Sequence, residues 1–98
     1  MDFQVVFKEA FLRDLERIVR AISLRNLEAA RKLGETIIKT GLSLTFFPER
    51  FPKVRQRPGV RRFIVSKYFK VFYRVRSDAR VVEILCCWDG RRKSDPTL

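Results

Sequence analysis

The 98-residue chain contains no histidine, and this absence excludes several kinds of site at once. Histidine is the side chain whose ordinary pKa lies near neutrality, so His-based acid–base catalysis and Ser-His triads are excluded. Ordinary zinc sites are excluded for the same reason. We therefore expect neither a metal nor a cofactor.

Cysteine and long apolar runs are also scarce. The two cysteines, Cys86 and Cys87, are adjacent, and adjacent side chains on a strand point to opposite faces, which disfavours a disulfide between them. We expect both to be reduced packing residues. No run approaches the roughly 20 apolar residues that span a bilayer, and residues 1–11 lack the zones of a secretory signal. We expect one cytoplasmic domain over residues 1–98, without membrane association.

Acidic residues are outnumbered by basic ones, 11 to 22, which gives a net charge of +11. The excess lies in residues 50–98, which hold 14 basic side chains, ten of them arginine, and only 4 acidic ones. A basic surface of this kind attracts polyanions, and arginine suits phosphate and carboxylate pairing. The pattern favours a negatively charged partner; a solvated surface kept for solubility is the alternative.

Three stretches rich in Val, Ile, Phe and Tyr follow one another at residues 60–66, 70–75 and 80–88. Short polar breaks at residues 67–68 and 77–78 separate them. A parallel crossover needs a dozen or more residues, so the three stretches predict an antiparallel meander.

Alternation of side chains divides this meander into two faces. Within each strand, we expect the following residues to lie on the same face: Arg61 with Phe63, Arg62 with Ile64, Lys70 with Phe72 and Arg74, Cys86 with Ile84 and Trp88, and Cys87 with Glu83. One face must be the core. The other is part apolar and part basic, which is typical of a partner-binding surface.

The first half of the chain predicts a strand at residues 3–7 and two helices. The apolar stripe of the first helix is Phe11, Leu15, Ile18 and Ile22. Asn26 is a good N-cap for the second helix, with Glu28 in its first turn. The apolar residues of that helix are Ala30, Leu33, Ile37 and Leu44. Its glycines, Gly34 and Gly41, indicate a close approach to the first helix, and chance placement is the alternative.

Pro48 ends the second helix, and a basic loop follows at residues 49–59. We expect Phe46, Phe47 and Phe51 to anchor this loop to the edge of the core. Residues 89–98 form a polar, basic tail, in which Pro96 bars a long helix. The order predicts an α+β fold, β-α-α-β-β-β, with an antiparallel helical hairpin on one face of a four-stranded sheet.

Several short motifs carry a resemblance over nearly the whole chain. They are Asp14-Leu15-Glu16-Arg17-Ile18, Ala29-Ala30, Leu44-Thr45-Phe46-Phe47-Pro48, Arg61-Arg62-Phe63, Val71-Phe72-Tyr73-Arg74-Val75, Ile84-Leu85 and Trp88-Asp89-Gly90-Arg91-Arg92. In this order they resemble the RelE/ParE toxin superfamily, also described as plasmid stabilisation proteins. The resemblance implies a toxin of a type II toxin–antitoxin module, in bacteria or archaea. It also implies a small acidic antitoxin whose C-terminal segment wraps the toxin.

The resemblance implies one of two targets. RelE-like members cleave mRNA in the ribosomal A site with basic residues on the sheet, whereas ParE-like members inhibit DNA gyrase and lack that catalytic set. The RelE-type catalytic positions fall on Arg61, Lys70 and Arg91. The wider target- or phosphate-binding set is Arg61, Arg62, Lys70, Arg74, Arg91 and Arg92. Asp89 replaces the family's frequent C-terminal histidine, which leaves Lys70, Tyr68, Glu83 and Asp89 as candidate proton shuttles.

Plainer roles stay open for some of these residues. Arg74 can equally pair with Glu83 across neighbouring strands, Arg91 and Arg92 can belong to a solvated tail, and Tyr73 and Trp88 fit packing better than base stacking. We favour a ParE-like gyrase inhibitor, which is not an enzyme. The alternatives are a RelE-like ribosome-dependent endoribonuclease and a non-toxic basic binding module. No small-molecule substrate is expected.

Overall fold

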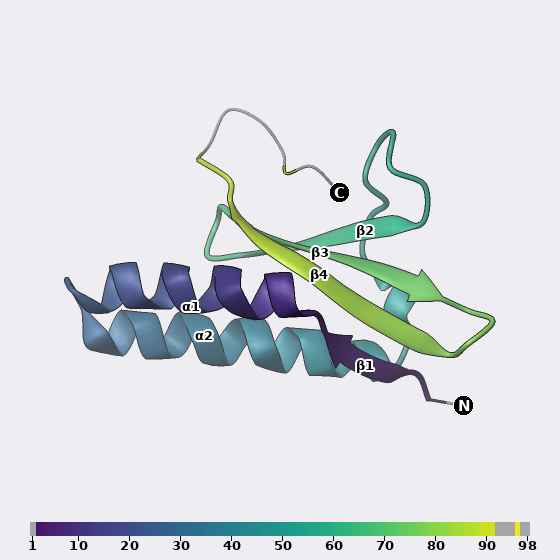
Figure 1. The fold of residues 1–98 in the computed structure, drawn as a ribbon, viewed down its shortest axis with the longest axis horizontal. Helices are drawn as coiled ribbons and strands as arrows, with labels where there is room; N and C mark the ends of the chain where they lie inside the picture. Colours follow the sequence, from purple (N-terminus) through teal and green to yellow (C-terminus); the bar gives the residue numbers. More distant parts are fainter. Residues whose placement is uncertain (1, 92–95, 97–98) are drawn as a thin grey trace.

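The computed structural model describes residues 2–91 and residue 96, and its elements follow the predicted order (Figure 1). The helices and strands are β1 (Gln4–Phe7), α1 (Glu9–Ser23), α2 (Leu27–Leu42), β2 (Val60–Val65), β3 (Phe69–Arg76) and β4 (Val81–Asp89). Two short 3-10 turns, Ser43–Thr45 and Pro48–Arg50, follow α2. The β-α-α-β-β-β prediction is confirmed. Most of the predicted tail, residues 92–95 and 97–98, lies outside the described residues.

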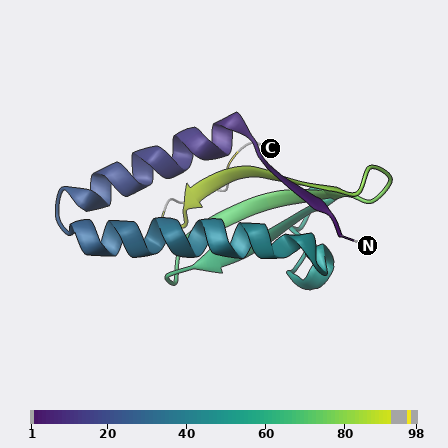
Figure 2. The same cartoon turned by 90° about the horizontal axis from the view of Figure 1, so that it is seen from below.

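The four strands form one mixed sheet in the order β1-β4-β3-β2. β2, β3 and β4 pair antiparallel, which confirms the meander. β1 runs parallel to β4, with Gln4 paired to Val81. The helical hairpin, β2 and β3 lie between these two strands in the chain, so the connection is long enough for a parallel pair. The hairpin covers one face of the sheet (Figures 1 and 2). We call the other face, which none of the described helices covers, the open face.

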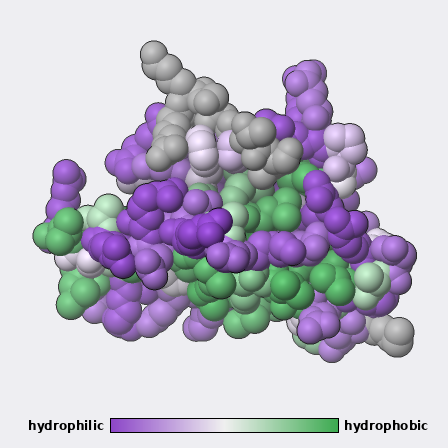
Figure 3. Space-filling model, in the orientation of Figure 1, coloured by the Kyte–Doolittle hydropathy of each residue, from purple (hydrophilic) through white to green (hydrophobic). Residues whose placement is uncertain are grey.

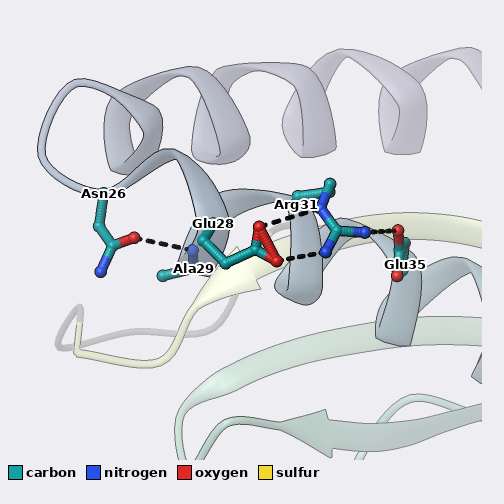
Figure 4. Close-up of polar contacts among 5 residues, drawn as sticks. All are labelled: Asn26, Glu28, Ala29, Arg31 and Glu35. Atoms are coloured by element: carbon teal, nitrogen blue, oxygen red, sulfur yellow. Dashed lines mark hydrogen bonds and ion pairs between the residues drawn. The ribbon is translucent and has the colours of Figure 1, made fainter.

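Both helices turn their apolar stripes toward the sheet, as predicted. Phe11 of α1 and Ile37 of α2 are fully buried, and Ile18 and other stripe residues pack against the same core. The side-chain oxygen of Asn26 accepts a hydrogen bond from the backbone N–H of Ala29 at 3.0 Å (Figure 4). This bond satisfies one of the amides that a helix start leaves without a partner, and it confirms the predicted cap.

The two glycines of α2 have different neighbours. A Cβ at Gly34 would lie 3.5 Å from Val19 of α1, in ordinary contact. A Cβ at Gly41 would lie 3.0 Å from the ring of Phe7 in β1. The predicted approach to the first helix is therefore confirmed for Gly34 and wrong for Gly41, where a strand residue comes close.

A β-bulge in β4 changes the predicted faces. Phe72 pairs with Cys86, but the next residue, Tyr73, pairs with Ile84, so Leu85 is the extra residue. Cys87 therefore joins Ile84 in the main core, while Cys86 and Trp88 pack around Phe72 on the open face. The prediction that Cys86 and Trp88 share a face with Ile84, and Cys87 with Glu83, is wrong because the bulge interrupts strict alternation.

Both cysteines are free and buried, and they point to opposite faces as predicted. Burial raises the pKa of each thiol to about 12, so both stay protonated at neutral pH, consistent with a packing role. The backbone N–H of Cys87 donates to the Asp14 carboxylate at 3.1 Å. β1 pairs with β4 only as far as Ile84, so it offers no partner to the Cys87 amide. The Asp14 carboxylate accepts that hydrogen bond instead.

The three loop aromatics divide into one half-buried ring, Phe51, and two exposed ones. Phe51 packs on Phe63, with ring centroids 5.4 Å apart, as predicted. Phe46 and Phe47 are 57% and 83% exposed, so the prediction that they anchor the loop is wrong. The two 3-10 turns meet at Phe47, and Leu44 and Pro48 take the buried positions instead.

Candidate functional site

Three of the predicted cations surround one buried ring on the open face. Phe72 of β3 is fully buried, and Lys70 and Arg74 flank it along the same face of the strand. Arg62 of β2 is paired with Phe72. Arg62 therefore lies diagonally across from Lys70 and from Arg74, and diagonal neighbours of this kind in a sheet are roughly 7–8 Å apart. The structure therefore brings Arg62, Lys70 and Arg74 together.

The arginines of the helical layer are largely neutralised by acidic residues one turn away. In α1 the ion pairs are Arg13–Glu9, Arg17–Asp14 and Arg20–Glu16, at 2.9 to 3.1 Å. In α2, Arg31 binds both Glu28 and Glu35 (Figure 4), and the hydrogen bond with Glu28 is the main cause that raises its pKa. Each exposed pair adds little stability, but together they reduce the positive potential of the helices.

The open face is different, because neither Arg62 nor Arg74 forms an ion pair with any described residue. Glu83 lies opposite Arg74 in the ladder, but its carboxylate binds Arg76 at 2.8 Å and Lys8 at 3.8 Å. The alternative interpretation of Arg74, an ion pair with Glu83, is therefore wrong. These two guanidinium groups are available to an anionic partner.

Arg61 lies on the helix side of the sheet and holds a loop. Its guanidinium donates to the carbonyl oxygens of Glu49 at 3.0 Å and Phe51 at 2.8 Å, and 17% of the side chain is exposed. Arg61 is paired with Tyr73, which faces the core, whereas Lys70 shares the open face with Phe72. The structure therefore separates Arg61 from Lys70, two residues that a RelE-like reaction would use together.

Arg91 follows β4 and lies at the same end of the sheet as Lys70. A Cβ on the intervening Gly90 would lie 3.3 Å from Lys70 Cε. Arg91 donates to both carboxylate oxygens of Asp89, at 2.9 and 2.6 Å, and stacks over the ring of Tyr68 at 4.6 Å. The hydrogen bond to Asp89 raises the pKa of Arg91. Arg91 is thus held by two neighbours, and Arg92 lies outside the described residues.

The remaining polar candidates have packing or pairing roles. Tyr73 is fully buried, its hydroxyl donates to the carbonyl oxygen of Pro48 at 2.6 Å, and burial raises its pKa to about 12. Trp88 packs with Phe72 and Cys86. Both observations confirm the packing roles expected for Tyr73 and Trp88.

Arg57, which the sequence patterns do not single out, joins this surface. The loop folds back at residues 54–60, where the N–H of Val54 donates to the carbonyl of Val60 at 2.9 Å. A cavity of about 160 Å³ forms there, lined by Gln56, Arg57, Pro58, Val60 and Arg74. The sequence signal is only a run of basic residues, which does not indicate the arginine that will lie beside Arg74.

An apolar groove lies between the helical hairpin and the sheet, near the start of β3. It encloses about 530 Å³ and is lined in part by Ile22, Leu33 and Phe69, with Arg25 and Arg91 among its polar residues. Apolar surface with nearby cations suits an amphipathic acidic segment of a partner protein.

The described residues contain no group of three His, Cys, Asp or Glu side chains that could hold a metal ion. None of their helices combines the length and apolarity that crossing a bilayer requires.

Comparison with known families agrees with the motifs in the sequence. The family model described as "ParE toxin of type II toxin-antitoxin system, parDE" matches residues 5–94. The chain therefore belongs to the ParE toxin family, within the RelE/ParE superfamily. It is a toxin of a type II toxin–antitoxin system. Comparison with curated proteins gives no match.

Solved structures from both branches of the superfamily share the fold. A chain of the chromosomal ParDE toxin–antitoxin system from P. aeruginosa superposes with a TM-score of 0.75 at 19% identity, covering 89% of this chain and 95% of that one. The RelBE2 toxin–antitoxin complex of Mycobacterium tuberculosis gives a TM-score of 0.68 at 17% identity, covering 91% and 99%. A mutant of the E. coli toxin RelE in the free state gives a TM-score of 0.65 at 18% identity, covering 91% of this chain and 84% of that one. At these identities the likeness shows the fold alone.

Proposed function

We propose that this toxin inhibits DNA gyrase by binding it in the cytoplasm and is neutralised by a cognate acidic antitoxin. The family that matches residues 5–94 is named for ParE, and one similar solved structure comes from a ParDE system. In this proposal the chain is one domain that acts by binding, without catalysis. A role in plasmid stabilisation follows from the same resemblance.

The separation of Arg61 from Lys70 supports gyrase over mRNA as the target. Cleavage of RNA by its 2′-hydroxyl needs charge stabilisation at phosphorus, with groups that move protons placed beside it. Arg61 lies on the opposite face from Lys70, and its guanidinium is engaged by two backbone carbonyls. One observation favours the RelE-like alternative, namely that Lys70 and Arg91 lie at the same end of the sheet.

The open face and the apolar groove supply the chemistry for an antitoxin. The M. tuberculosis RelBE2 and E. coli RelBE structures are toxin–antitoxin complexes. In this chain Arg62 and Arg74 have no ion-pair partner among the described residues, so carboxylates of an acidic segment can neutralise them. The apolar side chains of the same segment can fill the groove beside Phe69.

The two activities can be separated with the purified chain. We expect it to inhibit supercoiling by purified gyrase, and added antitoxin to relieve that inhibition. We expect no cleavage of mRNA on stalled ribosomes. If mRNA is cleaved, and Lys70→Ala or Arg91→Ala abolishes the cleavage while supercoiling is unaffected, the RelE-like alternative is correct. If neither activity is seen and overexpression does not slow growth, the chain is a basic binding module.

A further inference from the structure

Phe46 and Phe47, which we call the aromatic projection, are exposed side by side between α2 and β2. Figure 2 shows the chain turning sharply there, at the end of α2 near the N-terminus. Phe47 adopts φ 48° and ψ 58°, in the left-handed region that a bulky side chain rarely enters. Such a conformation persists only where the surrounding structure holds it. Neither packing in the core nor binding at the basic open face explains why these two rings are exposed.

Three polar side chains brace the backbone on both sides of the aromatic projection. Arg50 donates to the carbonyl oxygens of Phe46 at 2.9 Å and Ser43 at 3.3 Å. Tyr73 and Arg61 hold the carbonyls of the segment that follows, from Pro48 to Phe51. The two rings are therefore presented on a fixed support, so a partner that binds them loses less free energy to ordering the loop.

The charges beside the aromatic projection do not match a nucleic acid. The guanidinium of Arg50 is turned back onto the loop, 4.9 Å from the ring of Phe51, and Arg61 points inward. The Glu49 carboxylate, exposed next to the projection, forms an ion pair with the Arg61 guanidinium at 4.0 Å. Single-stranded nucleic acids bind aromatic rings that lie along a cationic groove. Exposed rings beside a carboxylate instead complement an apolar pocket of a protein, in which aromatic side chains dominate the binding energy.

The aromatic projection also lies away from the open face. Its support is attached to the helix side of the sheet, because Tyr73, which holds Pro48, belongs to the main core. Arg62 and Arg74 lie on the other side. An anionic partner on the open face and an apolar pocket at the projection would therefore use different surfaces of the toxin.

We infer that Phe46 and Phe47 insert into an apolar pocket of the toxin's target protein. This inference rests on the proposed function and therefore names gyrase as the owner of that pocket. Arg61 and Tyr73 are then positioning residues, which act through the loop that they hold.

The test compares two double variants of the full chain, Phe46→Ser/Phe47→Ser and the control Leu24→Ser/Leu27→Ser. Leu24 and Leu27 are 85% and 73% exposed at the turn of the helical hairpin, where Figure 3 also shows hydrophobic residues. We expect the phenylalanine variant to bind immobilised gyrase at least about tenfold more weakly, and the leucine control to stay within about twofold of wild type. Phe47→Tyr, which keeps the ring, should retain inhibition. The melting temperature and the affinity for the antitoxin should be unchanged.

Four other outcomes overturn the inference. Wild-type inhibition by the phenylalanine variant rules out the projection while the proposed function stands. A loss of antitoxin affinity with full inhibition assigns the projection to the antitoxin, and a loss of affinity for a single-stranded oligothymidylate assigns it to nucleic acid. If the wild-type chain itself does not bind gyrase, both the inference and the proposed function fail.

Discussion

Tyr73→Phe removes one hydroxyl from a fully buried ring and should destabilise the protein measurably. The hydroxyl donates to the carbonyl oxygen of Pro48 at 2.6 Å, and Pro48 is itself buried. Leaving a buried acceptor without its donor costs about 1–3 kcal/mol. A loss of about 1.5 kcal/mol would lower the melting temperature of a domain of this size by roughly 6–12 °C.

Urea unfolding followed by circular dichroism gives the free energy of unfolding for the variant and wild type. Tyr68→Phe is the matched control, because Tyr68 is only partly buried and makes a ring contact with Arg91 that does not use its hydroxyl. The control should change the free energy by less than about 0.5 kcal/mol. If Tyr73→Phe matches the control, the hydroxyl does not stabilise the loop as we infer.

The pH dependence gives a second check on Tyr73. Burial raises its pKa from 10.0 to about 12 in the folded state, so the folded protein favours the neutral phenol. This contribution is fully present below pH 10 and is lost as the pH rises through 12. The stability difference between wild type and Tyr73→Phe should therefore shrink over that interval, while the buried thiols titrate alike in both proteins. A difference that stays constant would contradict the assigned burial.

Three further predictions concern other parts of the molecule. Gly90→Ala places a Cβ 2.3 Å from the carbonyl oxygen of Tyr68 and should lower the free energy of unfolding by about 1–3 kcal/mol. Gly34→Ala, whose Cβ would have its nearest neighbour at 3.5 Å, should not destabilise the protein. If urea unfolding shows the same loss of unfolding free energy for Gly90→Ala and Gly34→Ala, the steric explanation is wrong. Because burial raises the pKa of Cys86 and Cys87 from 9.0 to about 12, a thiol reagent at pH 8 should label the native chain at least about 100-fold more slowly than the unfolded one. Equal labelling rates would show that the thiols are accessible. Arg62→Glu/Arg74→Glu should weaken antitoxin binding more than tenfold, roughly, whereas Arg13→Glu/Arg20→Glu, with the same change in net charge, should not; equal losses would indicate only long-range attraction.

The strands, the helices and their order could be predicted because each depends on local patterns. The stripe that begins at Phe11 and the cap at Asn26 depend only on neighbours in the sequence, and the breaks between the last three strands are too short for anything but hairpins. The resemblance added the superfamily, and the family match confirms it.

The features that could not be predicted depend on contacts between distant residues. The bulge at Leu85 lies where β4 stops pairing with β1 and the carboxylate of Asp14, in α1, accepts the hydrogen bond of the Cys87 amide. No local sequence pattern marks that point. The exposure of Phe46 and Phe47 follows from Leu44 and Pro48 occupying the available core positions.

The site was only partly predictable for the same reason. Alternation correctly placed Lys70 and Arg74 on one face of their strand, but only the fold shows that Arg62 lies on the same face of the sheet and which face the helices cover. It also shows that Arg61 is engaged by the carbonyls of Glu49 and Phe51, a contact between residues that are not adjacent in the sequence.

The position of β4 affects when the protein can fold during synthesis. β4 leaves the ribosome last among the strands, yet it occupies an inner place between β1 and β3. In a nascent chain that ends before Val81, Gln4 lacks its pairing partner, and Phe7 and Gly41 lack their neighbour Ile84. Because long-range pairing of this kind forms only once both segments are present, a translation product that ends before Val81 should not reach this fold. A chain that stops short of β4 therefore cannot present the surfaces through which this toxin would bind its partners.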